Sequence, residues 1–312
     1  MRAAGLVLGY LADQVFGDPR RWHPVSGFGK VARSVERTMY ADNRSAGVAF
    51  TMVLVGSTGL LGWTADRVTR SRPLLNTAVV AVATWVVLGG RSLGAEAGAL
   101  DDQLRRPARA AAPPRGQVTH LVGRDPSQLD ADDIARATIE SVAENTSDAV
   151  VAPLVWGAVL GPAGLLGYRA ANTLDARVGH RTPRLERFGW ASARFDDVLN
   201  LVPARLTALL AAALGGRPVA ALRAWRRDAH KHPSPNAGPV EAAFAGALGI
   251  TLGGANVYHG VVEDRGTLGD GPAPVPADIA RTARLAARVG AGALVSTVAP
   301  AVAVRVAVRR RR

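Results

Sequence analysis

Uncharged apolar runs alternate with charged segments along the chain. Ser45–Ala65 holds 21 uncharged residues and Pro73–Gly90 holds 18. At 1.5 Å per helical residue, such runs approach or cross a hydrocarbon core of about 30 Å. We therefore predict a transmembrane helical hairpin whose turn is residues 66–72. A third span is predicted at Val289–Val304, directly before an arginine-rich tail.

Two further uncharged runs are interrupted by polar or helix-breaking residues. Ala149–Tyr168 contains two prolines and four glycines, and Ala242–Val262 contains Asn256 and His259. In a membrane protein, such segments form broken or re-entrant helices that are buried in protein or line a cavity. The alternative is a buried helix of a large soluble protein. Paired prolines indicate a linker at residues 108–117, and Gly and Pro indicate a loop at 264–277.

Residues of high helix propensity fill nearly every long segment, and the period-2 alternation typical of strands is scarce. No repeat of fixed period is visible. We predict a mainly α-helical, polytopic membrane protein that forms a single domain over residues 1–312. Its polar catalytic segments are expected between the apolar helices, some of which are broken or re-entrant.

The chain is strongly basic, with 38 Lys and Arg against 25 Asp and Glu and a net charge of +13. Nearly all the cations are arginine, which fits codon bias, phosphate recognition, or arginine beside the cytoplasmic ends of spans. Because the tail 305–312 follows an apolar run, it indicates a cytoplasmic stop-transfer anchor and no nucleic-acid partner. Segments 17–44 and 91–148 would then be cytoplasmic and the turn 66–72 outside, although this turn carries three arginines.

Features missing from the sequence exclude several kinds of site and of processing. The chain contains no cysteine, which excludes disulfides, cysteine-ligated zinc and iron–sulfur clusters. The apolar stretch 3–12 is short and has no clear cleavage site, so no cleaved signal peptide is expected. The nucleotide-binding and esterase motifs GxxxxGK[ST], GxGxxG after a strand and GxSxG are also missing from the sequence.

The densest group of acidic residues lies at 137–153. In a helix, Glu140, Glu144 and Asp148 stand at i, i+4 and i+8, so the three carboxylates share one face. Like charges at this spacing repel, and solvent, arginine or a divalent cation offsets the repulsion. An exposed acidic face is the plain alternative. The apolar run from Ala149 places these acids at a membrane boundary, which favours a Mg²⁺ site.

Two more clusters combine acids, amides and arginines. Asn172 and Asp175 are three residues apart on one predicted helical face, between Arg169 and Arg177. Farther on, Asp196, Asp197 and Asn200 share one turn, followed by Arg205 within an apolar stretch. Such groups coordinate metal and phosphate together, or they form ordinary salt bridges.

Two proline-containing loops carry the remaining candidates. The first, Gln14–Pro24, presents Asp18 and His23. The second, His230–Gly238, presents Lys231, Ser234 and Asn236 between prolines and fits a preorganised anion or substrate loop. Its two histidines have no third ligand nearby, which disfavours zinc.

Seven segments in order resemble the CobD/CbiB family of cobalamin biosynthesis. They span about residues 5–260 and read GDPRRWHPV, LVGRDPSQLD, ATIESVAENTSDAVVAPLVW, GYRAANTLDARVG, FDDVLNLVPARLTALL, SPNAGPVEAAFAGALGITLGG and NVYHG. An ordered series of long motifs is far more specific than one short pattern. Four positions depart from the family pattern: Arg169 replaces a common lysine, Ala176–Arg177 a common Ser-Met, and His180 a common tyrosine.

The resemblance implies a membrane enzyme of the adenosylcobinamide-phosphate synthase type. Its substrates would be adenosylcobyric acid and aminopropanol or aminopropanol phosphate, joined as an amide with ATP and Mg²⁺ and without a covalently bound cofactor. Metal ligands are expected among Glu140, Glu144, Asp148, Asp175, Asp196 and Asp197. Phosphate or substrate would be bound by Arg169, Asn172, Arg205, Lys231, Ser234 and Asn236, and the general base would be Asp18 or His23.

Two other function classes stay open at this point. One is a Mg²⁺-dependent membrane phosphotransferase or prenyltransferase, but the expected pair of aspartates four residues apart is missing. The other is a non-catalytic corrinoid-handling membrane protein. A homo-oligomer is also left open. The lipid bilayer is the expected surrounding in each case, with a multi-pass chain in the cell membrane.

Overall fold

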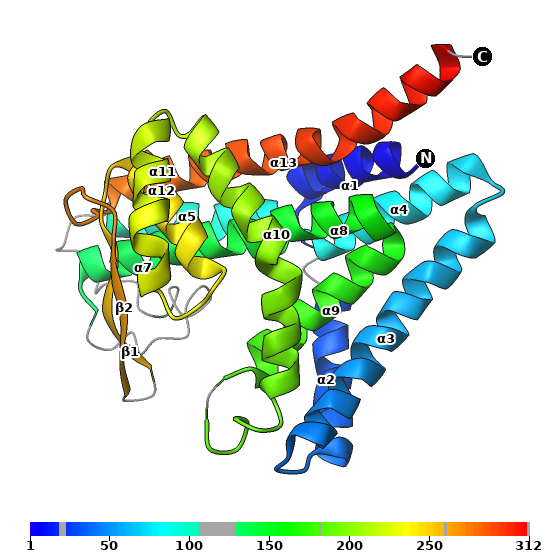
Figure 1. The fold of residues 1–312 in the computed structure, drawn as a ribbon, viewed down its shortest axis with the longest axis horizontal. Helices are drawn as coiled ribbons and strands as arrows, with labels where there is room; N and C mark the ends of the chain where they lie inside the picture. Colours follow the sequence, from blue (N-terminus) through cyan, green and yellow to red (C-terminus); the bar gives the residue numbers. More distant parts are fainter. Residues whose placement is uncertain (19–22, 106–115, 117–128, 181, 259–260, 311–312) are drawn as a thin grey trace. The chain divides into compact units, whose positions relative to one another are not determined.

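The computed structural model describes residues 1–18, 23–105, 116, 129–180, 182–258 and 261–310. Apart from residue 116, the predicted linker at 108–117 lies outside the described residues. The described chain is mainly α-helical with a two-stranded antiparallel sheet, which confirms the predicted fold class (Figure 1). The chain forms two compact units. The prediction that residues 1–312 make up a single domain stays a prediction. Unit 1 comprises Met1–Arg91, Ala152–Asn200 and Leu294–Arg312, and unit 2 comprises Ser92–Val151 and Leu201–Ala293.

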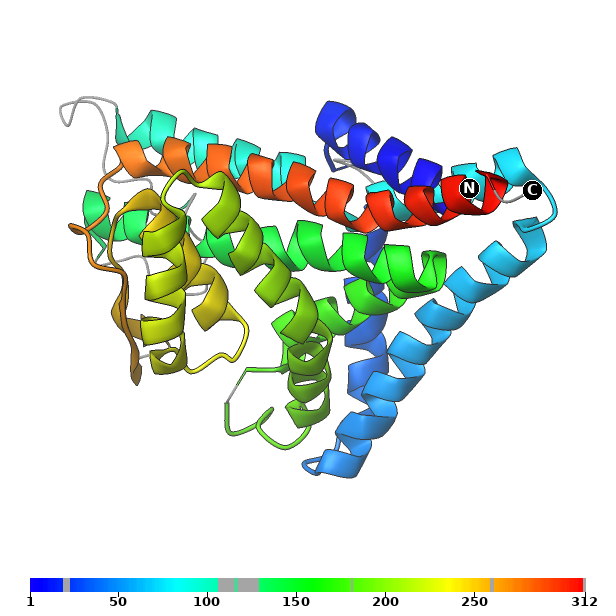
Figure 2. The same ribbon diagram turned by 45° about the horizontal axis from the view of Figure 1, so that its top comes forward.

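Unit 1 is built from helices. Its helices are α1 (Arg2–Phe16), α2 (Pro24–Met39), α3 (Arg44–Thr69), α4 (Pro73–Val87), α8 (Ala152–Leu160), α9 (Pro162–Val178) and the first part of α10 (Trp190–Leu214). The Asn43 side chain caps α3 by accepting from the N–H of Ala46, and Pro73 opens α4, a position where its missing N–H costs nothing. The two consecutive spans predicted on either side of the turn are confirmed as α3 and α4, which diverge from this turn in both views (Figures 1 and 2). Helix α3 packs mainly on α9, and α4 packs mainly on α1.

Three stretches of the described chain are long and apolar enough to cross a membrane. They are Arg44–Thr69, Pro73–Leu104, which joins α4 to α5 (Gly90–Leu104), and Trp190–Leu214. Val198 and Val202 on α10 are 61% and 66% exposed, whereas Asp196 and Asn200 on the same helix are buried. Apolar residues outside and polar residues inside is the arrangement expected of helices that face lipid.

A further span was predicted at Val289–Val304, which belongs to α13 (Ala277–Arg310). The side chains of residues 300–310 lie outside the described part of the chain, so this span stays a prediction. The third candidate among the described residues is α10, whose Asp196 is buried in the protein, whereas Arg194 and Asp197 pair near the surface.

The interrupted run Ala149–Tyr168 is broken, as predicted. Ser147–Val151 forms a π-helical turn leading into α8, and Gly161, with φ +66°, separates α8 from α9. Pro153 has no N–H for the carbonyl four residues earlier, which accounts for the widened turn before it. Since α8 packs along α9, the two helices form a tight hairpin.

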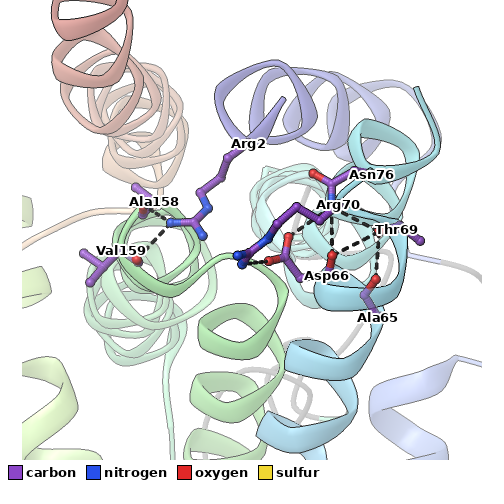
Figure 3. A network of polar contacts seen from close by, with 8 residues as sticks. All are labelled: Arg2, Ala65, Asp66, Thr69, Arg70, Asn76, Ala158 and Val159. Atoms are coloured by element: carbon purple, nitrogen blue, oxygen red, sulfur yellow. Dashed lines mark hydrogen bonds and ion pairs between the residues drawn. The ribbon is translucent and has the colours of Figure 1, made fainter. Parts of the chain in front are cut away.

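One end of unit 1 is tied together by polar contacts (Figure 3). The Arg2 side chain donates to the carbonyls of Ala158 and Val159 at 3.2 and 2.9 Å, which satisfies the end of α8. In the α3–α4 turn, Asp66 accepts from Arg70 and Asn76, both at 3.0 Å. The start of α1, the turn 66–72 and the α8–α9 turn therefore lie at the same end.

Close helix packing in unit 1 makes Gly62 a sensitive position. A Cβ on Gly62 would overlap the Pro162 carbonyl, whereas a Cβ on Gly56 of the same helix would meet nothing within 4 Å. We expect Gly62→Ala to lower the free energy of unfolding by about 1–3 kcal/mol, because the α8–α9 turn must move. Thermal unfolding in detergent measures this. Gly56→Ala is the matched control and should be neutral or stabilising; equal effects of the two would contradict the packing.

Unit 2 contains helices and the hairpin. Its further elements are α7 (Ala131–Thr146), the π turn, the rest of α10, α11 (Pro218–Asp228), a 3₁₀ turn (Ala229–Lys231), α12 (Ala237–Leu248), β1 (Leu252–Tyr258), β2 (Val261–Leu268) and the first half of α13. Two predictions need correction here. Ala242–Val262 was expected to form a broken or re-entrant helix, but Gly249 (φ +70°) ends α12 and the run continues as the strand β1. The predicted loop 264–277 begins only after Leu268, where β2 ends.

Candidate functional site

A buried polar cluster joins α9 to α10 within unit 1. It consists of Tyr168, Arg169, Asn172, Asp196 and Asn200, and we call it the α9–α10 cluster. The Tyr168 hydroxyl donates to the Asn200 Oδ1 at 2.8 Å, and the Asn200 Nδ2 donates to the Asp196 Oδ2 at 2.9 Å. From α9, the Asn172 Nδ2 donates to the other Asp196 oxygen at 3.4 Å. The Asp196 carboxylate is therefore held by an amide from each helix.

This arrangement combines anionic and cationic groups. Asp175 is one turn from Asn172 on α9 and acts electrostatically on Asp196. The Arg169 Nη1 donates to the Asn172 Oδ1 at 3.4 Å, while its buried Nε has no hydrogen-bond partner among the described residues. Carboxylate oxygens suit a divalent cation and a guanidinium suits phosphate. The predicted group Arg169, Asn172, Asp175 and Asp196 thus includes neighbours in space.

Two residues near this cluster are engaged elsewhere. Asp197, beside Asp196 in the chain, accepts from Arg194 at 3.2 Å at the surface. Arg177, expected beside Asp175, lies 3.4 Å from Glu36 of α2, which Arg184 also contacts at 2.9 Å. The reason is helical geometry: successive residues differ by about 100° around the axis. Arg177, two residues after Asp175, is thus paired with Glu36 of α2.

In unit 2, two side chains of α7 hold the backbone N–H and carbonyl of one residue of β1. The Glu140 Oε1 accepts from the Gly253 N–H at 2.8 Å, and the Arg136 Nη1 donates to the Gly253 carbonyl at 2.5 Å. Glu140 is only 2% exposed. Gly253 has φ +84° and sits at a β-bulge, where a Cβ would overlap the Gly266 carbonyl. We call Arg136, Glu140 and Gly253 the α7–β1 clamp.

Contrary to the prediction, Glu144 and Asp148 do not extend a single acidic helical face from Glu140. Glu144 lies in α7, but Asp148 lies in the π turn. A π turn shifts the helical register, so the three carboxylates do not follow one regular α-helical face. Both Glu144 and Asp148 are partly exposed, unlike Glu140.

The predicted magnesium ligands do not gather into one cluster of three or more carboxylates or histidines among the described residues. Mg²⁺ bound with a nucleotide needs only one or two protein carboxylates, with phosphate and water completing its shell. The Asp175 and Asp196 carboxylates fit that smaller requirement. The six-residue ligand set stays a prediction.

The loop of residues 230–238 is fixed by its own side chains. The Ser234 Oγ accepts from the N–H groups of Asn236 and Ala237, and the Asn236 Oδ1 accepts from the Arg205 Nη1 at 2.7 Å. Lys231 does not extend freely, because its Nζ lies 2.7 Å from Asp228. Arg205, Ser234 and Asn236 are thus brought together, and Lys231 forms a separate ion pair.

Asp228, which pairs with Lys231, also accepts hydrogen bonds from two other groups. It is fully buried, and it accepts from Arg227, Lys231 and the Gly269 N–H. Burial alone would raise the pKa of the Asp228 carboxyl, but these donors together lower it well below its usual range. Asp228 therefore stays ionised and ties α11 to the end of β2.

The two histidines of the loop differ in environment: His230 is exposed and His232 is buried. The His232 Nδ1 accepts from the Ser234 N–H at 3.0 Å, so the neutral ring carries its proton on Nε2, 3.7 Å from the Glu241 carboxylate of α12. Burial, with Arg265 of β2 adding to it, lowers the pKa of His232 to about 4.

This shift predicts a loss of stability in acid. The unfolded chain binds a proton at His232 below pH 6.5, but the folded chain does so only near pH 4. Stability is therefore complete above pH 6.5 and falls between pH 6.5 and 4, by about 3 kcal/mol for this group. His232→Asn keeps an acceptor for Ser234, so its unfolding should depend less on pH in this range. The exposed His230→Asn is the control, and parallel pH curves for His232→Asn and wild type would contradict this assignment.

In the first loop, His23 caps the helix that follows it. The His23 Nδ1 accepts from the Val25 N–H at 3.1 Å and caps α2, and its Nε2 lies 3.5 Å from Asp18. Nearby, the buried Asp13 accepts from the Arg91 N–H at the start of α5. Burial, with Asp18 adding to it, raises the pKa of Asp13 to about 6.

Several site residues escaped the sequence reasoning. Tyr168 bonds to Asn200, Arg136 and Gly253 form the clamp with Glu140, and Asp13 approaches Asp18. Asn200 itself was grouped with Asp196 from the sequence, because the two share one helical turn. Tyr168, Arg136 and Gly253 depend on contacts between distant segments.

Comparison with known proteins identifies the family. The model of the CobD/Cbib protein family matches residues 6–286. The cobalamin biosynthesis protein CobD of Mycobacterium tuberculosis is 51% identical over 302 residues, covering 95% of both chains. The proteins of the same name from Chromobacterium violaceum and Geobacter metallireducens are 44% and 43% identical, covering about nine tenths of each chain. No solved structure matches significantly. This protein therefore belongs to the CobD/CbiB family.

Proposed function

We propose that this protein acts in cobalamin biosynthesis as an ATP-dependent, amide-forming membrane enzyme of the adenosylcobinamide-phosphate synthase type. The observation that carries the proposal is the similarity to cobalamin biosynthesis proteins CobD along nearly the whole chain. The α9–α10 cluster supports it, because it offers carboxylates and an arginine suited to a magnesium nucleotide.

The proposed reaction joins the free propionate of adenosylcobyric acid to the amine of aminopropanol or aminopropanol phosphate. A carboxylate is a poor acyl donor, so a propionate oxygen first takes the γ-phosphoryl group of ATP and ADP leaves. The amine nitrogen then attacks the acyl carbon, the C–O bond to phosphate breaks, and the nitrogen loses one proton. The products are the amide, ADP and inorganic phosphate.

Each step assigns work to residues of this chain. Asp196 and Asp175 would hold the magnesium that accompanies ATP, which neutralises phosphate charge when bound. Arg169 would bind a phosphate oxygen through its unpartnered Nε. Asp18 would take the amine proton. His23 is the weaker candidate base, because its Nδ1 already accepts from Val25 and its Nε2 faces Asp18.

A single-turnover assay tests this function directly. The purified protein in lipid nanodiscs receives adenosylcobyric acid, ATP, Mg²⁺ and labelled aminopropanol or its phosphate. We expect label to enter a corrinoid amide with one ADP formed per amide, and the faster amine identifies the substrate. Corrinoid binding without amide formation would favour the non-catalytic alternative, and transfer of phosphate to a lipid would favour the phosphotransferase.

We also propose that segment 17–44 faces the cytoplasm and the turn 66–72 faces outside. Asn172 lies ten residues, or about 15 Å, along α9 from the end of unit 1 that holds this turn, which brings the α9–α10 cluster toward the cytoplasmic supply of ATP. The C-terminal tail would also be cytoplasmic.

The cysteine-free chain allows a direct measurement of this orientation. In intact spheroplasts, a membrane-impermeant maleimide should label Ser71→Cys but not Ser34→Cys, since both positions are exposed and lie on opposite sides. Ser34→Cys should react only after the membrane is opened. The reverse pattern would invert the orientation.

A further inference from the structure

Helix α11 presents a basic and apolar face in which Val219, Arg223 and Arg226 are exposed and Leu222 is half-buried. Its buried positions Ala221, Ala224 and Asp228 pack toward α12, beside which α11 lies in both views (Figures 1 and 2). The opposite face carries Val219, Leu222, Arg223 and Arg226. With Arg227 these residues line a shallow hollow of about 590 Å³. We call Val219, Leu222, Arg223 and Arg226 the α11 outer face.

Two cations of this face are not compensated by acidic groups of the described residues. Arg227 at its edge is neutralised by Asp228 and Asp270. Arg223 and Arg226 form no hydrogen bond or ion pair with the part of the chain that the structure describes. Val219 beside them is 67% exposed. The face thus joins two uncompensated positive charges to an aliphatic surface.

The position of α11 in the chain indicates what this face meets. The candidate span α10 ends at Leu214, and α11 begins at Pro218, after a turn in which Gly216 has φ +84°. A helix that follows a span after three residues starts at the membrane surface. Helices that lie in the lipid interface have aliphatic residues on one face with arginines that reach the headgroups.

We propose that α11 is an interfacial helix whose outer face docks on the anionic phospholipid headgroups of the leaflet in which α10 ends. Val219 and Leu222 would enter the boundary of the acyl region, and Arg223 and Arg226 would bind lipid phosphates. Docking would fix the start of the ordered loop at 230–238, which follows α11 directly.

The test uses the full chain with one cysteine, Leu222→Cys, labelled with an environment-sensitive fluorophore in nanodiscs. Emission should shift to the blue in phosphatidylglycerol-containing nanodiscs relative to phosphatidylcholine alone, and iodide quenching should decrease. Adding Arg223→Gln and Arg226→Gln should lower the docked-to-free ratio about fivefold per arginine. High salt should act in the same direction.

Controls separate docking from other effects. A label at the exposed Ala287→Cys on α13 should not respond to lipid charge, and Arg284→Gln on the same helix should leave the Leu222→Cys signal unchanged. Val219→Cys repeats the measurement if a label at Leu222 disturbs the helix. Equal emission and quenching in both lipids, or a signal removed by free inorganic phosphate instead of by neutral lipid, would overturn the proposal. None of these outcomes depends on amide formation. The docking proposal is therefore tested independently of the proposed function.

Discussion

Replacing Asp196 with asparagine is expected to slow amide formation about 100-fold or more while the protein stays folded. Each oxygen of the Asp196 carboxylate accepts from an amide, one from Asn172 and the other from Asn200. An asparagine offers only one acceptor oxygen, so one of these donors would face another N–H donor. The variant also removes a negative charge at the proposed magnesium nucleotide. Single-turnover amide formation, with a Mg²⁺ titration, measures the loss.

The control for this variant is Asp42→Asn, which neutralises a carboxylate that is exposed and 3.8 Å from Arg187. It should keep the wild-type rate. Thermal unfolding of both variants separates a catalytic loss from misfolding. If Asp196→Asn kept the full rate, the α9–α10 cluster would be a structural network and the magnesium site would have to lie elsewhere.

The two consecutive spans could be predicted because α3 and α4 are uncharged over nearly their whole length. Helix α10 could not be recognised by the same criterion, since Asp196, Asp197 and Arg205 interrupt it. Only the structure shows that Asp196 is buried while Val198 and Val202 face outward. Counting charges in a window ignores the face on which they lie. A helical pattern that separates polar from apolar positions would have found this span.

The β-hairpin escaped prediction for a different reason. The glycines at 253 and 254 adopt positive φ and form a bulge, so β1 does not alternate polar and apolar residues. Part of its stabilisation comes from α7, which lies more than a hundred residues earlier in the chain. Local sequence contains no signal for such a contact.

In the candidate site, contacts within one helix could be predicted from the sequence and contacts between helices could not. Spacing within one helix placed Asn172 near Asp175 and Asp196 near Asn200, because positions three or four apart share a face. Pairing between helices was beyond that reasoning, as with Tyr168 and Asn200 or Arg205 and Asn236. The π turn at 147–151 also altered a spacing argument that assumed a regular helix.

Glu140 offers the sharpest separation of a structural role from a metal-binding role. The Gly253 N–H that it accepts is buried, so Glu140→Ala leaves this donor without its partner and should lower the free energy of unfolding by about 1–3 kcal/mol. Glu140→Gln keeps an acceptor oxygen in the same place and should lose less than about 1 kcal/mol. Proteolysis of the hairpin at 252–268 should accelerate in the alanine variant alone.

The same pair of variants decides how Glu140 serves the reaction. If its task is to position β1 through the α7–β1 clamp, Glu140→Gln keeps most of the amide-forming activity and an unchanged Mg²⁺ requirement, while Glu140→Ala loses both stability and activity. A glutamate that binds magnesium would instead lose activity in both variants, with a raised Mg²⁺ requirement, since the neutral amide is a poor ligand. Glu186→Ala, an exposed glutamate, controls for the loss of one negative charge. The geometry of the clamp favours the first result, because one carboxylate oxygen is already occupied by a backbone N–H.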